Sequence, residues 1–164
     1  MSIVDLIKDD HKEVQHIIDR LCGTSDNAVK TRRALFADLR RLVLTHAKAE
    51  EKALYQSVEN EEDLHDIILE SFEEHSLVEK LIRGLEKVDP HDEAWAAKFS
   101  VLKENIEHHV EEEEGQLLPK IKKLLSKEEL EELAEEFLQF KKEIDVEERD
   151  VHKPARSGHI SHHP

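Results

Sequence analysis

The sequence predicts an all-α protein: an up-down-up-down four-helix bundle with an additional C-terminal helix. Two observations favour helices. Leu, Glu, Lys, Ala and Ile dominate a chain that has only four Gly and four Pro, and apolar residues recur at helical spacing in five segments. A repeated helix pair, described below, indicates how the first four segments are arranged. The length of 164 residues is typical of one domain.

The first predicted helix covers about residues 2–21. Its apolar stripe includes Ile7 and Ile18, and His11 interrupts that stripe. Gly23 and the short polar residues after it end the helix. Just before Gly23 lies the single cysteine of the chain, which cannot form an internal disulfide and is expected to be buried as a small apolar residue.

The second predicted helix covers about residues 28–58 and carries His46 and Glu50 within its apolar face. The third is expected to begin directly after Asn60. The Asn60 side chain can cap a helix, and the acidic residues that follow it suit a first helical turn. This helix should run to about Val88, where an Asp-Pro pair follows.

The fourth predicted helix covers roughly residues 91–118, and Pro119 is expected to kink or end it. The fifth begins with a capping box formed by Ser126 and Glu129 and has a short apolar seam. This helix can pack on the bundle or pair with another chain, and its two heptads favour the bundle.

A repeat relates the first helix pair to the second. The segment Asp-Asp-His11 aligns with Glu-Glu-His75, and the apolar stripes after these segments fall in register. The segment from His46 to Glu50 aligns in the same way with the segment from His109 to Glu113. Two copies of a helix pair, each with one His and one His-x-x-x-Glu, predict an up-down-up-down bundle.

The repeated residues predict a metal site in the bundle core. His and Glu four residues apart share one face of a helix, so a single helix can offer both to one site. Four imidazoles and two carboxylates suit iron, manganese or zinc. If both glutamates bridge, the six side chains together fill about eight of the about twelve coordination positions of two metals. An oxo or hydroxo bridge would leave about two positions open for a small molecule. The six candidate metal ligands are His11, His46, Glu50, His75, His109 and Glu113.

The alternative is that these six residues are ordinary polar groups near helix boundaries. That reading suits any one of them, but six polar groups repeated within apolar stripes would leave unpaired charges in a dry core. Glu51 and Glu114 can add a terminal carboxylate if the helix unwinds slightly, although an acidic helix usually exposes its charge. Tyr55 can act as a radical or as a proton donor near the metals, but a tyrosine more commonly packs at the end of a bundle with its hydroxyl in water.

The order His, His-x-x-x-Glu, His, His-x-x-x-Glu over residues 2–125 resembles the hemerythrin HHE cation-binding family. The resemblance implies two non-heme iron ions bridged by Glu50 and Glu113, and no residue is assigned a catalytic role. Oxygen-carrying hemerythrins have a further histidine where this sequence has Glu79, and their last carboxylate is an Asp five residues after its histidine. The more symmetric set found here is similar to HHE proteins associated with sensing, iron handling or removal of reactive species.

The expected function is binding of O2, H2O2 or NO, with peroxide disproportionation as a catalase-like activity. The alternatives are an iron or oxygen sensor that acts through a protein partner, and O2 storage or transport. A formal charge of -15 argues against nucleic acid and anionic membranes as partners. No apolar run approaches the roughly 18 residues that span a bilayer, and we expect a cytoplasmic monomer or homodimer.

The expected domain organisation has three parts. Residues 1–125 form the metal-binding bundle, residues 126–150 form the C-terminal helix, and residues 151–164 form a disordered tail. Four histidines of this tail are left out of the site because the tail has no apolar periodicity.

Overall fold

The computed structural model describes residues 1–151, and the side chains up to residue 148. Except for Val151, the expected tail of residues 151–164 lies outside this range, together with its four histidines. The long helices are α1 (Ile3–Cys22), α2 (Val29–Glu50), α4 (His65–Glu86), α5 (Glu93–Glu112) and α7 (Lys127–Val151). Shorter segments continue α2 and α5: π-helical η1 (Glu51–Tyr55) and α3 (Gln56–Val58) follow α2, and π-helical η2 (Glu113–Leu117) and α6 (Leu118–Leu124) follow α5.

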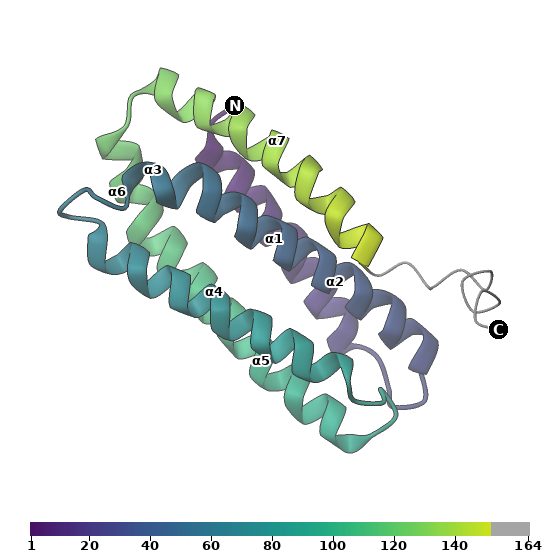
Figure 1. Ribbon diagram of the computed structural model, residues 1–164. Coiled ribbons are helices and arrows are strands. Elements are labelled where there is room, and N and C mark those ends of the chain that lie inside the picture. Colours follow the sequence, from purple (N-terminus) through teal and green to yellow (C-terminus); the bar gives the residue numbers. More distant parts are fainter. Residues whose placement is uncertain (152–164) are drawn as a thin grey trace, which may run out of the picture.

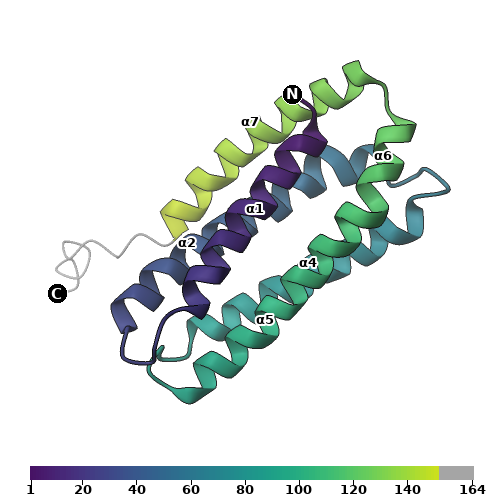
Figure 2. The same ribbon diagram turned by 180° about the vertical axis from the view of Figure 1, so that it is seen from behind.

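Four antiparallel helices form the bundle, as the repeat predicts. α1 packs against α2, and α4 packs against α5. α7 lies along α1 and α2, on the side away from α4 and α5 (Figures 1 and 2). The all-α fold class and the additional C-terminal helix are therefore confirmed. In the described part of the chain, every helix is too short or too polar to traverse a lipid bilayer.

Side-chain caps begin several of the helices. The Val4 amide donates to Ser2 Oγ at the start of α1 (3.0 Å). The predicted capping box is confirmed at the start of α7, because the Glu129 amide donates to Ser126 Oγ (3.1 Å) and the Ser126 amide donates to Glu129 Oε1 (3.0 Å).

The expected start of the third helix is wrong. α4 begins at His65, and Asn60 does not cap it. The intervening residues form a turn in which the Leu64 amide donates to the Glu61 carbonyl (3.0 Å). Leu64 is buried in the core. The His65 amide also donates to the Glu61 carbonyl (2.9 Å), so this turn provides the first backbone hydrogen bonds in place of a cap by Asn60.

The expectations for Pro119 and the cysteine also need correction. The α-helical path changes at Glu113, before the proline, and continues past it to Leu124. Pro119 lies in the first turn of α6, where a missing N–H group costs little. Cys22 is exposed at the end of α1 rather than buried.

The core consists of two apolar clusters. One contains Ile7, Leu54 and Phe137, and the other contains Ile18 and Trp95. Along each bundle helix, the candidate site residues lie between the residues of these two clusters. The polar layer therefore crosses the bundle between two dry cores, which keep it from bulk water.

Candidate metal centre

All six candidate ligands are buried, and each lies on one of the four bundle helices or at the start of η2. The structure brings them together in two overlapping groups. In each group the ligand atoms lie within 4.8 Å of one another. One group contains Glu50, His75, His109 and Glu113, and the other contains His11, His46 and Glu113. Glu113 is common to both groups, which is the arrangement that a bridging carboxylate requires.

Each of the four histidines has a carboxylate at its outer nitrogen. The hydrogen bonds join Nδ1 of His11 to Glu114 (2.6 Å), of His46 to Asp10 (2.7 Å), of His75 to Glu51 (2.8 Å) and of His109 to Glu74 (2.8 Å). A carboxylate on Nδ1 keeps the proton there and leaves the Nε2 lone pair free for a metal. All four Nε2 atoms face the two glutamates in the core.

These outer carboxylates follow the internal repeat. Asp10 and Glu74 each precede a histidine, and Glu51 and Glu114 each follow a glutamate of the site. Glu51 and Glu114 hydrogen-bond to histidines instead of joining the inner groups as terminal ligands. The roles of Asp10 and Glu74 were not foreseen, although the acidic residue before each histidine was visible in the repeat.

Several buried polar atoms of the site have no hydrogen-bond partner. They are His11 Nε2, His46 Nε2, Glu50 Oε2 and Glu113 Oε1. His11 Nε2 lies 3.1 Å from Glu113 Oε1, yet the geometry does not make a hydrogen bond. Unpaired buried polar atoms cost free energy of about 1–3 kcal/mol each. A cation between the imidazoles and carboxylates would satisfy these atoms. The residues therefore fit a metal ion of intermediate softness, such as iron, manganese or zinc.

The electrostatics of the layer favour positive charge. Burial opposes protonation of His46, but the charge of Glu50 and the hydrogen bond with Asp10 outweigh it and raise the pKa of His46 to about 10. Burial likewise opposes protonation of His109, and the hydrogen bonds with Glu113 and Glu74 raise its pKa to about 10. Burial would raise the pKa of Glu113, but its histidine neighbours hold it well below the usual range.

Tyr55 belongs to the site, and the expectation of a solvated hydroxyl is wrong. The residue is fully buried, and its hydroxyl donates to Glu50 Oε1 (3.0 Å) and also contacts Glu113. On an α-helix, Tyr55 would point about 140° away from Glu50. In η1 the backbone bonds instead span five residues, as from the Gln56 amide to the Glu51 carbonyl, and this spacing returns Tyr55 to the face of Glu50.

The second half of the bundle has the same π-helical segment but not the same side chain. In η2 the Leu118 amide donates to the Glu113 carbonyl. Leu118 occupies the position in the repeat that Tyr55 occupies in the first half. Both bridging candidates are thus followed by a π-helical turn, and only one of these turns supplies a hydroxyl group.

A small cavity adjoins the four histidines on the side of the Trp95 cluster. Its volume is about 40 Å³, and aliphatic side chains such as Val14, Val43 and Val78 form the rest of its wall. One water molecule needs roughly 10–15 Å³ by this kind of measure. The cavity therefore has room for a diatomic molecule or a peroxide, but not for a large substrate.

Residues 2–121 match the model of the hemerythrin HHE cation binding domain. The chain belongs to this family. A solved structure of a hemerythrin HHE cation binding domain-containing protein from Mycobacterium kansasii has the same fold, with a TM-score of 0.78 and 20% sequence identity. The similarity covers 90% of this chain and 89% of that one.

A curated relative of this hemerythrin HHE protein is described as a DNA nickase from Nostoc sp. (strain PCC 7120 / SAG 25.82 / UTEX 2576). The two sequences are 27% identical over 147 residues, which cover 88% of this chain. This chain spans only 40% of the length of that relative.

Glu79 stands where the resemblance to oxygen-carrying hemerythrins would place a further histidine. Glu79 accepts a hydrogen bond from Arg83 (2.9 Å) and lines a surface pocket together with His75 and Glu51, but it is not a member of the inner groups. A separate group at the surface of the α4–α5 pair consists of Glu74, His108 and Glu112. Glu74 links this surface group to the core through its hydrogen bond with His109.

Proposed function

We propose that this hemerythrin HHE protein holds two non-heme iron ions that Glu50 and Glu113 bridge, and that the centre binds O2, H2O2 or NO. The activity that we infer is disproportionation of peroxide, as a defence against reactive species. The observation that carries the proposal is the orientation of the four imidazoles. Each has its Nδ1 against a carboxylate and its Nε2 toward the same two glutamates.

The carboxylates at Nδ1 give the centre a fixed shape. They hold each ring in one orientation, and their negative charge makes each imidazole a stronger donor to a metal. The two inner carboxylates and four outer ones also offset the charge of two cations in a core of low dielectric constant. When bound, a pair of irons would supply the electrons that peroxide chemistry exchanges.

Tyr55 and the cavity supply the remaining parts of the proposed site. Burial and the nearby charge of Glu113 raise the pKa of Tyr55 well above its usual value. The hydroxyl therefore stays protonated and can hold or give a proton at the two carboxylates. The aliphatic wall formed by Val14, Val43 and Val78 excludes large polar molecules and favours small neutral ones.

Iron content and peroxide turnover test this proposal. The iron-loaded protein should contain about two irons per chain and consume peroxide over many cycles. Glu113→Gln should lose both properties, because an amide cannot bridge two cations. Glu111→Gln is the matched control, since Glu111 is exposed on the same helix. A protein that holds two irons but never turns over peroxide would contradict the proposed activity.

A regulatory role is the second candidate, and the position of α7 favours it. Lys141 of this helix donates to Asp10, which hydrogen-bonds to His46. Iron binding at the centre can therefore change the contacts of α7, which lies on the outside of the bundle. In this case chelation of iron should change the helicity or the oligomeric state, whether monomer or homodimer. An unchanged elution volume and circular dichroism spectrum would count against this role.

Nucleic acid is not the partner that we propose, although the longer relative is described as a DNA nickase. The formal charge of -15 repels the phosphate backbone. Incubation of the iron-loaded protein with supercoiled plasmid should therefore leave the plasmid intact. A cytoplasmic location is part of the same proposal.

A further inference from the structure

The four carboxylates at the outer nitrogens of the histidines do not have equal surroundings. Lys141 of α7 donates to both carboxylate oxygens of Asp10, at 2.7 and 2.9 Å. Within the part of the chain whose side chains are described, no lysine or arginine forms an ion pair with Glu51, Glu74 or Glu114. The repeat that makes the two halves of the bundle alike therefore does not extend to the cation.

The helix that carries Lys141 also covers the imidazole of His46. Phe137 is fully buried. Its ring packs nearly perpendicular to the His46 ring, and the two ring centroids are 5.7 Å apart. The Lys141 ammonium lies 5.4 Å from the centre of the Phe137 ring. His46 is thus held at Nδ1 by Asp10 and on its side by Phe137, and Lys141 contacts both of these residues.

His109 is the counterpart of His46 in the repeat, and its surroundings are more open. Its carboxylate partner, Glu74, belongs to the surface group with His108 and Glu112, so a histidine and a second carboxylate lie where the other half has a lysine. Among residues 1–151, no additional helix covers this side, because α7 lies along α1 and α2 (Figures 1 and 2). The side chain of Glu74 is 20% exposed, compared with 11% for Asp10.

We propose that Lys141 is a positioning residue that makes the two metal positions unequal, so that the ion beside His11 and His46 exchanges more slowly than the ion beside His75 and His109. The inference rests on the two-ion centre proposed above. A metal ion leaves when its ligands swing away one after another, and a histidine can swing only if its Nδ1 partner moves with it or the hydrogen bond breaks.

Asp10 cannot follow His46 easily, because two charge-assisted hydrogen bonds tie it to Lys141. Glu74 has no lysine or arginine partner among the described side chains, and its neighbours His108 and Glu112 lie at the surface of the α4–α5 pair. The two ions should therefore leave at different rates, and we expect the anchored Asp10 to outweigh the additional carboxylate, Glu50, that the structure gathers beside His75 and His109.

Release of iron to an excess of a ferrous chelator, without oxygen, tests the proposal on the full chain loaded with two irons. The expected result is two phases of one iron per chain each. Lys141→Met keeps the aliphatic stem over Phe137 but removes the charge, and it should speed the slow phase by about three- to tenfold. This is less than the roughly 10–100-fold loss of metal affinity that follows removal of a direct hydrogen-bond partner of a ligand, because Lys141 acts through Asp10. Lys141→Arg should keep the slow phase of the parent protein, because a guanidinium can bind both oxygens of Asp10.

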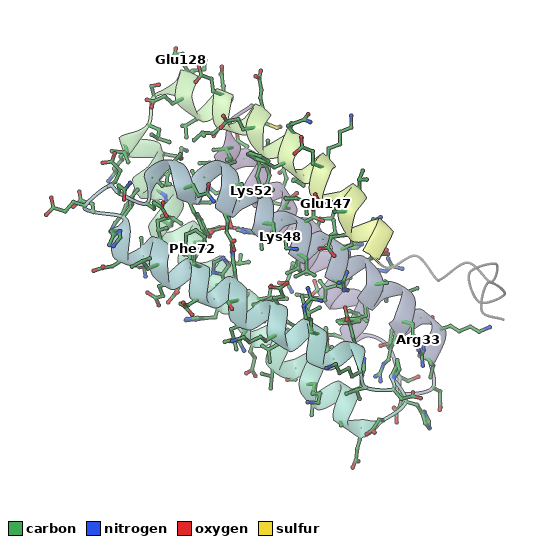
Figure 3. All side chains as sticks on the ribbon, in the orientation of Figure 1. Arg33, Lys48, Lys52, Phe72, Glu128 and Glu147 are labelled. Carbon is green, nitrogen blue, oxygen red and sulfur yellow. The ribbon has the colours of Figure 1, made fainter. Side chains whose placement is uncertain are left out.

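Two matched variants separate this role from simple docking of α7. Glu148 anchors the far end of α7 by accepting hydrogen bonds from Arg40 (3.0 Å) and Lys48 (3.0 Å), and Lys48 lies on α2 beside α7 (Figure 3). Glu148→Gln should leave the slow phase within about twofold of the parent protein, because its partners do not touch Asp10. Lys142→Met, at the exposed neighbouring position, should not change either phase.

Three outcomes would overturn the proposal. They are a single release phase for both irons in the parent protein, an unchanged slow phase in Lys141→Met, and an equal acceleration in Glu148→Gln. Failure of the proposed function is a separate result. A chain that holds two irons with two release phases but does not consume peroxide would support this inference and reject that activity. A chain that consumes peroxide but releases both irons in one phase would support the activity and reject this inference.

Discussion

Replacement of Tyr55 by phenylalanine removes one hydroxyl group from the centre of the site and leaves the ring in place. The ring packs on Phe72 and stacks on His75, so no cavity forms. The single hydroxyl proton lies between carboxylate oxygens of Glu50 and Glu113, and both of these side chains are almost fully buried. Because a hydrogen bond to a charged group contributes about 1.5–3 kcal/mol, and because the carboxylates keep their histidine neighbours, we expect Tyr55→Phe to destabilise the metal-free protein by about 2–3 kcal/mol.

Thermal unfolding of the metal-free protein, followed by circular dichroism, measures this loss. For a chain of this length the midpoint should fall by roughly 5–10 °C. Thr45→Val is the matched control, because it also removes one buried hydroxyl, but the Thr45 hydroxyl has no hydrogen-bond partner. The control should be neutral or slightly stabilising. Equal midpoints for Tyr55→Phe and the parent protein would refute the role of this hydroxyl in holding the two carboxylates.

Three further predictions concern proton release on iron loading, the pH dependence of stability, and the cap of the last helix. His46 and His109 have a pKa of about 10 when no metal is bound, so iron loading at pH 7 should release at least about two protons per chain; calorimetry in two buffers of different ionisation enthalpy measures them, and release of less than about one would contradict the prediction. Since these values lie above the ordinary 6.5, the contribution of both imidazoliums to metal-free stability should be complete below pH 6.5 and lost as the pH rises toward about 10, which urea unfolding across that range can check. Ser126→Ala removes the cap that Glu129 completes and should cost about 1 kcal/mol in the same urea assay; an unchanged midpoint would show that the start of α7 does not need it.

The number of long helices and the helical faces that carry the six inner residues could be predicted from the sequence. Both follow from local periodicity, because residues three or four apart share a helical face whatever the rest of the chain does. The His-x-x-x-Glu spacing that begins at His46 and at His109 therefore indicated two convergent helices, and the structure brings His11 and His75 to the same layer. Whether these residues bind a metal stays a prediction until iron is measured.

The start of α4 and the place of Tyr55 could not be predicted from periodicity. α4 begins at His65, after a turn that places Leu64 in the core, and the burial of Leu64 involves residues elsewhere in the chain. Tyr55 reaches Glu50 only because the backbone of η1 is π-helical. A pattern that assumes 3.6 residues per turn places this side chain on the wrong face.

The repeated helix pair and its polar residues are visible in the order of residues along the chain, but the difference between the two halves depends on how distant helices pack. The repeat treats Asp10 and Glu74 as equivalent, and in the folded protein both accept a hydrogen bond from a histidine. Lys141 is 131 residues from Asp10 along the chain, and it distinguishes the two halves because α7 folds back over α1 and α2. The physical reason is that hydrophobic spacing specifies the face of a helix locally, whereas the partner of a charged side chain depends on which distant helix packs against that face.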